Sequence, residues 1–315
     1  MDRVISVFKR IPIVIWFVLL LVIVFSFISE HYLTMRNLVI LLQQGAALLV
    51  VAAAATFVII SGGLDLSLGS IMTLSGVTVA LSLNAGLPIP IVILIGAATG
   101  FACGAINGVL ISYSGLQPFI VTLGTQGVFY GFALVLTDKV GVPVSNESFI
   151  FLGSLVNKVI PMAFICCLII YIFAIFVQDR TRLGRYLYAI GGNMEGARLS
   201  GINTKFWKWL VYSFAGFLTG LAAVVLVARL EVADPLVGMK WEFEAIAATI
   251  LGGTSMNIGK GDVKGTIVGV ALLTVIRSGL NVIRIPSLWQ PAIIGAVIIL
   301  AIVFQVGITA KEMKK

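Results

Sequence analysis

The chain has 315 residues, of which 60% are apolar and 11% are charged, with a mean hydropathy of +1.12 and a formal net charge of +8. Soluble domains are typically about half apolar and about a quarter charged, so this composition excludes an ordinary globular protein. The same figures exclude disordered, collagen-like and disulfide-stapled chains. The sequence therefore predicts a polytopic membrane protein.

Apolar runs recur along the chain at the length that a membrane helix needs, about 20 residues for a hydrocarbon layer about 30 Å thick. The alternation of apolar and polar residues over about ten positions that marks a membrane β-strand is absent. We expect an all-α fold with about ten transmembrane helices, which form a single membrane domain over residues 1–315. The runs are 11–29, 38–60, 68–84, 88–112, 119–137, 159–177, 207–228, 242–257, 265–283 and 288–306.

Basic residues in the connecting segments indicate the orientation of these helices. With both termini on the cytoplasmic side, most of the 21 Lys and Arg residues fall in inner segments. The positive charge is then explained by topology and by contact with lipid headgroups, so no nucleic-acid partner is required. The three cysteines, Cys103, Cys166 and Cys167, lie inside predicted helices, which favours neither a disulfide framework nor a zinc site.

Two connecting segments are long. The outer one, 137–158, is mixed in charge and could carry a short surface helix. The inner one, 178–206, is basic and contains a stronger pattern. There Asn193 is a good N-cap for a short helix of about two turns, Glu195 would lie in its first turn, and Gly201 would end it.

Two interpretations of this short inner helix remain open. It could lie on the membrane surface and simply close the loop between two spans. Alternatively, it could be a rigid docking element that inserts into a cytosolic partner. The pattern alone does not identify that partner.

Two glycine-rich breaks separate predicted helices. The first contains Gly62 and Gly63, followed by Asp65 and Ser67, either of which could cap a helix that begins near Leu68. An acid close to membrane spans is also a functional candidate, and a glycine-flanked break is a natural hinge. The second break carries another glycine pair, which would make the two breaks traces of an internal repeat. That second pair is Gly252 and Gly253.

Glycines spaced four apart predict close helix packing. The longest series lies in the run 88–112, and shorter pairs occur in 119–137 and 207–228. We expect packing within the chain, with a subunit interface as the alternative. The residues are Gly96, Gly100, Gly104 and Gly108, then Gly127 with Gly131, and Gly216 with Gly220.

Residues for catalysis are few. The single histidine, His31, cannot form a two-histidine metal site, and no Gly-x-Ser-x-Gly motif occurs. The acids and bases within spans, mainly Asp65, Glu244 and Arg277, are too few for a proton relay, and Glu242 and Glu244 are expected near the outer mouth of a span. The chain should therefore be a passive translocator that is not an enzyme. Polar residues on spans could line its path, or equally could bond to neighbouring helices. These are Gln117, Thr122, Gln126, Asn281 and Gln290.

Several motifs together resemble one family. The stretch 60–70 reads Ile-Ser-Gly-Gly-Leu-Asp-Leu-Ser-Leu-Gly-Ser, and 181–193 reads Thr-Arg-Leu-Gly-Arg-Tyr-Leu-Tyr-Ala-Ile-Gly-Gly-Asn. With 197–202, 244–255 and 259–266, they resemble permease subunits of ribose/xylose/galactose-type bacterial ABC importers, which are related to branched-chain amino-acid permeases. The resemblance runs from about residue 37 to the last span. A departure lies at 256–258, where Met-Asn-Ile replaces a more glycine-rich stretch.

This resemblance implies a function and a set of partners. The chain would be the permease of an ATP-driven importer for a monosaccharide or a related solute in the bacterial cytoplasmic membrane. Its partners would be a cytoplasmic ABC ATPase, which binds ATP and magnesium, a second permease copy or homologue, and an extracytoplasmic solute-binding protein. The chain itself would carry no cofactor.

The resemblance also implies that the inner segment around 191–201 is a coupling helix seated in the ATPase. The residues expected to act there are Arg185, Gly191, Gly192, Asn193, Glu195, Arg198, Leu199 and Gly201. The alternatives are a stand-alone secondary transporter or channel, or an ABC permease for a nucleoside, an autoinducer-type sugar or a branched-chain amino acid. An intramembrane enzyme is less well supported, because the His and Ser constellations are missing.

Overall fold

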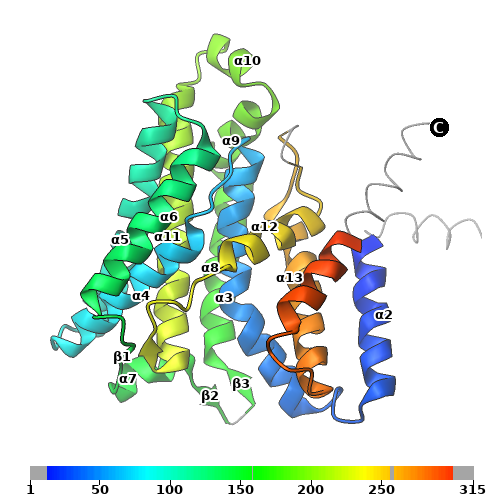
Figure 1. Cartoon of the computed structure of the whole chain (residues 1–315). Coiled ribbons are helices and arrows are strands. Elements are labelled where there is room, and N and C mark those ends of the chain that lie inside the picture. Colours follow the sequence, from blue (N-terminus) through cyan, green and yellow to red (C-terminus); the bar gives the residue numbers. More distant parts are fainter. Residues whose placement is uncertain (1–12, 158, 256–258, 301–315) are drawn as a thin grey trace, which may run out of the picture.

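The computed structural model describes residues 13–157, 159–255 and 259–300, and nearly all of its regular structure is helical. The helices stand side by side in one bundle (Figure 1). In chain order the larger ones are α2 (Ile13–Ile28), α3 (Met35–Ile60), α4 (Leu68–Asn84), α5 (Ile89–Ser112), α6 (Pro118–Leu136), α8 (Met162–Arg180), α11 (Thr204–Leu230), α12 (Trp241–Leu251) and α13 (Val263–Val282), and a further apolar helix includes residues 290–300.

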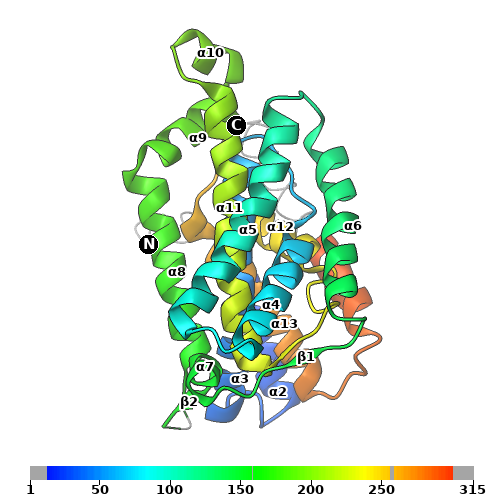
Figure 2. The ribbon, with the colours of Figure 1, turned by 90° about the vertical axis from the view of Figure 1, so that its left-hand side faces the viewer.

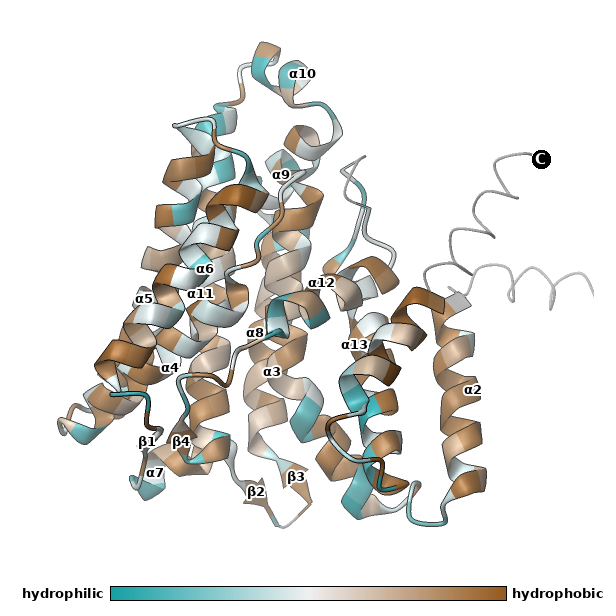
Figure 3. Ribbon diagram, viewed as in Figure 1, coloured by the Kyte–Doolittle hydropathy of each residue, from teal (hydrophilic) through white to brown (hydrophobic). Residues whose placement is uncertain are grey.

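Six of these helices, α3, α5, α6, α8, α11 and α13, are long and apolar enough to cross a membrane. Shorter apolar helices lie within α2, α4 and 290–300. In Figure 3 most of α2 and long stretches of the other helices carry the colour of hydrophobic residues. The mostly helical fold with six candidate spans agrees with the predicted all-α polytopic membrane protein, whereas the number of about ten spans stays a prediction.

The helix α12 differs most from its predicted span. The run 242–257 is already short for a crossing, and α12 is shorter still, with 11 residues, and ends at Leu251. The next two residues are glycines, and Gly253 has a φ of +92° that favours glycine and stops the helix. Gly62 ends α3 in the same way, with a φ of +74°. The glycine breaks are thus confirmed as helix terminators.

The predicted cap between α3 and α4 is wrong in detail. Ser67 occupies the N-cap position of α4, but its side chain makes no capping hydrogen bond to the helix. Asp65 instead accepts hydrogen bonds at Oδ1 from the backbone nitrogen of Ser67, at 2.8 Å, and from its hydroxyl, at 2.6 Å. This turn fixes the residues before α4, because an Asp side chain readily bonds the backbone two residues ahead.

The similarity of the two glycine breaks does not extend to the lengths of the helices around them. The first break leads from a long helix, α3, into the shorter α4, whereas the second leads from the short α12 into the longer α13. Residues 256–258, where the sequence departs from the family pattern, lie outside the described residues.

The glycine series in α5 packs against α11, as predicted. A Cβ atom added at Gly100 would overlap the carbonyl oxygen of Gly216, and one added at Gly216 would overlap that of Gly100. The two backbones therefore touch where neither helix has a side chain, which is how small residues bring membrane helices together. The expected packing within the chain is absent at Gly127 and Gly131, because no atom of another described element lies within 4 Å of either Cβ position, and the alternative of a subunit interface stays a prediction there. They face outward on α6.

The two ends of the bundle carry different structures (Figures 1 and 2). One end holds the predicted surface helix, α7 (Glu147–Ile150), followed by a 3₁₀ turn at Phe151–Gly153. Two short antiparallel pairs lie beside it, β1 (Val142–Pro143) with β4 (Val232–Ala233) and β2 (Leu155–Val156) with β3 (Ile160–Pro161). The opposite end holds α9 (Arg182–Gly192) and α10 (Met194–Leu199).

Candidate coupling site

The basic segment 178–206 folds into two helices where the sequence interpretation gave one. The additional helix, α9, has the apolar residues Leu183, Leu187 and Ile190 buried on one face. Their spacing of four and three residues is the pattern of an amphipathic helix, so the signal was present in the sequence. The break after α9 comes at Asn193, as predicted.

The short helix α10 has the predicted boundaries. Asn193 Oδ1 accepts a hydrogen bond of 2.8 Å from the backbone nitrogen of Gly196, so it is the N-cap. Gly201 follows the helix with a φ of +83°. Arg198 donates two hydrogen bonds to the Glu195 carboxylate, of 2.6 and 2.9 Å. These bonds hold the pKa of Glu195 below its usual value, so the carboxylate is ionised and paired at neutral pH.

The tip of α10 projects beyond the rest of the bundle (Figure 2). Its two large apolar residues are not covered, since Leu199 is 73% exposed and Met194 is 47% exposed. Arg185, on α9, is also exposed. Exposed apolar side chains on a rigid projecting helix are typical of a docking element. Glu195 and Arg198 already satisfy each other, so Leu199 and Met194 are the better candidates for direct contact with a partner.

The end of α9 touches both glycine breaks. Gly191 packs on the last turn of α3, because a Cβ atom there would overlap the carbonyl oxygen of Ile60. The same Cβ would lie 3.0 Å from the Cα atom of Gly259. A Cβ at Gly259 would in turn overlap the backbone nitrogen of Gly192. The end of α9 therefore contacts the segment that precedes α4 and the one that precedes α13.

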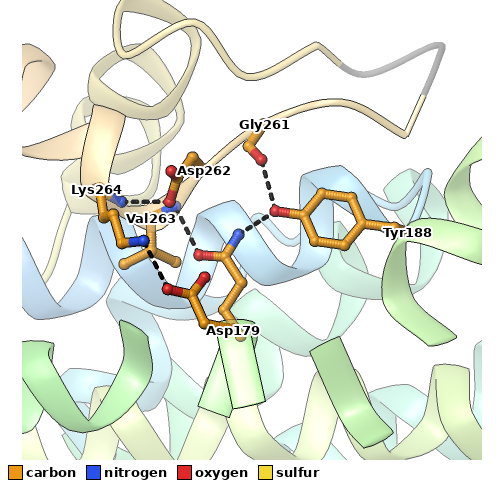
Figure 4. Close-up of polar contacts among 7 residues, drawn as sticks. Asp179, Tyr188, Gly261, Asp262, Val263 and Lys264 are labelled. Atoms are coloured by element: carbon orange, nitrogen blue, oxygen red, sulfur yellow. Dashed lines mark hydrogen bonds and ion pairs between the residues drawn. The ribbon is translucent and has the colours of Figure 1, made fainter. Parts of the chain in front are cut away.

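A ring of hydrogen bonds ties α8 and α9 to the start of α13 (Figure 4). The buried Gln178 side chain accepts at Oε1 from the backbone nitrogen of Val263, at 3.0 Å, and donates at Nε2 to the Tyr188 hydroxyl, at 2.5 Å. Tyr188 donates to the carbonyl oxygen of Gly261, at 2.7 Å. Burial raises the pKa of Tyr188, so its hydroxyl keeps the proton that this bond needs.

A second contact lies at the surface of the same cluster. Lys264 Nζ is 2.6 Å from Asp179 Oδ2, while Asp262 caps α13 by accepting a 2.8 Å hydrogen bond from the backbone nitrogen of Lys264. The ion pair is partly exposed, so it adds little energy and mainly fixes position. Sequence reasoning missed Gln178 and Tyr188 because nothing in their spacing links them to residues 261–263.

The polar candidates for the transport path do not all lie together. Gln126, on α6, donates a 2.7 Å hydrogen bond to Glu242 Oε1, and its neighbour Thr125 donates to Asn107 Oδ1, also at 2.7 Å. Asn107 donates to the Ser67 hydroxyl that bonds Asp65. The middle of α6 is thus held to the starts of α4 and α12.

The remaining polar candidates lie elsewhere. Gln117 is exposed at the start of α6, and Thr122 bonds within that helix to the carbonyl oxygen of Pro118, at 2.8 Å. Gln290 donates to Asn281 Oδ1, at 2.8 Å. The structure therefore gives four of the five candidates hydrogen-bonding partners without bringing all five to one surface.

The two acids of α12 do not lie at an outer mouth, as expected from the sequence. They follow the start of α12, which lies near half the height of the bundle (Figure 1). Glu242 is buried, and Glu244 accepts a 2.5 Å hydrogen bond from Arg277 on α13. The expectation placed the start of the run 242–257 at an outer end of the bundle, whereas α12 starts near half its height.

Comparison with known proteins assigns a family to this arrangement. Residues 37–302 match the family described as the permease component of branched-chain amino acid transport systems. The chain belongs to this family of membrane permeases. No solved structure matches it at a significant level.

Curated relatives of the permease cover nearly its full length. The D-allose transport system permease protein AlsC of Escherichia coli (strain K12) is 38% identical over 287 residues, 90% of this chain and 87% of that protein. The ribose import permease protein RbsC of Bacillus subtilis (strain 168) is 38% identical and covers 90% of this chain and 88% of its own. The galactose/methyl galactoside import permease protein MglC of Escherichia coli (strain K12) is 34% identical, covering 92% and 91%.

Proposed function

We propose that this permease is the membrane subunit of an ATP-driven importer for a monosaccharide or a closely related solute. The observation that carries the proposal is identity of 34–38% over about nine-tenths of the chain to permeases named for D-allose, ribose and galactose transport. The permease does no chemistry in this scheme. ATP and magnesium are bound by a separate ATPase.

The projecting helix α10 is proposed as the coupling helix that the ATPase grips. Its exposed apolar tip and its rigid cap support docking, and its base contacts both glycine breaks. Movement of α10 would therefore reach α4 and α13 through α9. Conversion between outward-facing and inward-facing states would follow such a movement, because packed helices shift as units.

The partners and orientation follow from the same proposal. The end that carries α9 and α10 faces the cytoplasm, in agreement with the basic residues of 178–206, and both termini lie on that side. The opposite end, with α7 and its short strands, receives a solute-binding protein. A second permease copy or a homologue completes the path, and the shorter helices α2, α4, α12 and 290–300 raise the number of membrane segments to about ten.

Neutralising the coupling helix tests this assignment. In the assembled importer, the double variant Glu195→Gln/Arg198→Gln and the single variant Leu199→Ser should each lower ATP-driven sugar uptake by about tenfold, a typical coupling energy. ATP hydrolysis should continue, and the yield of folded permease should be unchanged because all three side chains are exposed. Uptake and hydrolysis are measured together in proteoliposomes. Wild-type uptake by both variants would exclude α10 as the coupling helix.

A further inference from the structure

A cleft of about 420 Å³ opens between α12, α13 and the segment 287–298. It lies apart from the coupling site, at the other end of α12 and α13. Sites for small molecules usually measure about 300 to 1,000 Å³, so the cleft is large enough for one small solute. Its polar and aromatic lining includes Trp241, Phe243, Glu244, Arg277, Ser287 and Gln290.

The ion pair at this cleft is the first observation that points to a ligand. Glu244 and Arg277 are about one-quarter exposed, so they face the cleft without being fully solvated. Charged groups within membrane segments are costly and usually face a wet cavity. A guanidinium has five N–H donors and a carboxylate about four acceptor sites, so the bond between Arg277 Nη2 and Glu244 Oε1 uses one of each, and the described residues form no other side-chain hydrogen bond to either group.

The aromatic side chains supply the second observation. Trp241 and Phe243 lie on either side of Glu242 in the first turn of α12, and both line the cleft. Phe243 is 58% exposed, although α12 lies near half the height of the bundle. Rings beside hydrogen-bonding groups match a molecule that has both C–H faces and hydroxyl groups.

The charge of the lining indicates a neutral molecule. The charges of Glu244 and Arg277 cancel each other. The charge of Lys240, the other charged residue of the lining, is screened by solvent because this residue is exposed. A hydroxyl group can donate to the carboxylate and accept from the guanidinium, so a polyhydroxy solute can use both partners without separating their charges.

We propose that this cleft is a binding site for a neutral monosaccharide, held by hydroxyl bonds to Glu244 and Arg277 and by ring contact with Phe243. The inference rests on the proposed function and locates a substrate site for it in the chain. Gln290, one of the sequence candidates for the path, is part of the same lining. The site joins α12 to α13, the two helices whose connection contacts α9 at Gly259.

The site can be tested by ligand-observed NMR. The purified permease, in nanodiscs of phosphatidylethanolamine and phosphatidylglycerol, is titrated with D-ribose, D-allose and D-galactose, and saturation transfer to each sugar is measured. At least one sugar should bind with a Kd of about 1 mM, the weak affinity that suits a transit site. Glu244→Gln should weaken binding by about tenfold, because a charge-assisted hydrogen bond is lost.

Two further variants separate binding from folding. Phe243→Ala removes an exposed side chain and should weaken binding by about fivefold without loss of thermal stability. Glu147→Gln, which removes an exposed carboxylate on α7, is the matched control and should bind like the wild type. Saturation transfer that is absent for all three sugars, or equal in the wild type, Glu244→Gln and Phe243→Ala, would overturn the site. Tighter binding of D-ribose 5-phosphate than of D-ribose would overturn its selectivity for neutral sugars.

These outcomes are distinct from failure of the proposed function. If the assembled importer takes up a sugar that the cleft does not bind, the site is wrong and the importer assignment stands. If the importer takes up none of these sugars, the proposed function fails whatever the permease binds.

Discussion

Replacing Gly100 with leucine will abolish the accumulation of folded permease. Gly100 and Gly216 bring the backbones of α5 and α11 into contact, and even a Cβ atom at either position would overlap the other residue's carbonyl oxygen. A leucine side chain must push the two helices apart along their whole contact. Overpacking alone typically costs about 1–3 kcal/mol, and backbone overlap in a central helix pair should exceed that range.

The control for this experiment lies two residues further along the same helix. Ala102 is exposed on α5, so Ala102→Leu adds the same side chain on the outer face and should leave the yield unchanged. Detergent-extracted fluorescent fusions of both variants are compared by size-exclusion chromatography. A monodisperse peak of wild-type height for Gly100→Leu would show that α5 and α11 do not pack as described.

The double variant Gln178→Leu/Tyr188→Phe will uncouple ATP hydrolysis from transport. The Gln178 side chain joins the backbone of Val263 to Tyr188, which bonds Gly261 in turn, so the variant removes every hydrogen bond of the ring in Figure 4 that involves these two side chains. We expect sugar uptake to fall by about tenfold while ATP hydrolysis by the assembled importer persists, since coupling energies between sites are commonly of that size.

Tyr186→Phe provides the matched control for this variant. Tyr186 lies on the same helix, and its ring packs edge-on against Trp207 at a centroid distance of 4.8 Å. The substitution removes one phenolic hydroxyl, as Tyr188→Phe does, but leaves the ring around Gln178 intact. Uptake and hydrolysis by Tyr186→Phe should match the wild type. Full uptake by the double variant would mean that the path from α10 to α13 does not run through these hydrogen bonds.

Much of the fold could be predicted because local chemistry determined it. Long apolar runs predicted helices, and all six helices long enough to cross a membrane begin and end within three residues of predicted runs. Asn193 and Gly201 bounded α10 because capping and left-handed glycine conformations depend on neighbouring residues. The glycine series of α5 predicted a close contact face, because residues spaced four apart lie on one side of a helix.

The features that were missed depend on contacts between distant segments. Glu244 and Arg277 are 33 residues apart in sequence, and Gln178 is 85 residues from Val263, so neither pairing follows from local spacing. The end of α12 did follow from local sequence, since the predicted break at Gly252 and Gly253 directly follows Leu251. Gly127 and Gly131 show the converse limit, since a spacing predicts a contact face but does not show whether this chain supplies the partner.

These contacts connect the coupling site to the proposed sugar site. The end of α9 touches Gly259, and the hydrogen bonds of Gln178 and Tyr188 hold residues 261–263. From there α13 runs to Arg277, which lies beside Glu244. A displacement of α10 would therefore reach the cleft through one continuous set of packed elements. This path couples the two sites only if α10 and the cleft respond to the same movement of the helices. The uncoupling variants test the first site and the binding variants test the second.

The most direct test of the central claim is ATP-dependent sugar uptake by the permease reconstituted with its ATPase and its solute-binding protein. Proteoliposomes are supplied with radiolabelled D-ribose, D-allose or D-galactose, with and without ATP on the ATPase side. We predict that at least one sugar accumulates only when ATP, the ATPase and the binding protein are all present. Sugar uptake by the permease alone, or uptake driven by an ion gradient without ATP, would contradict the account.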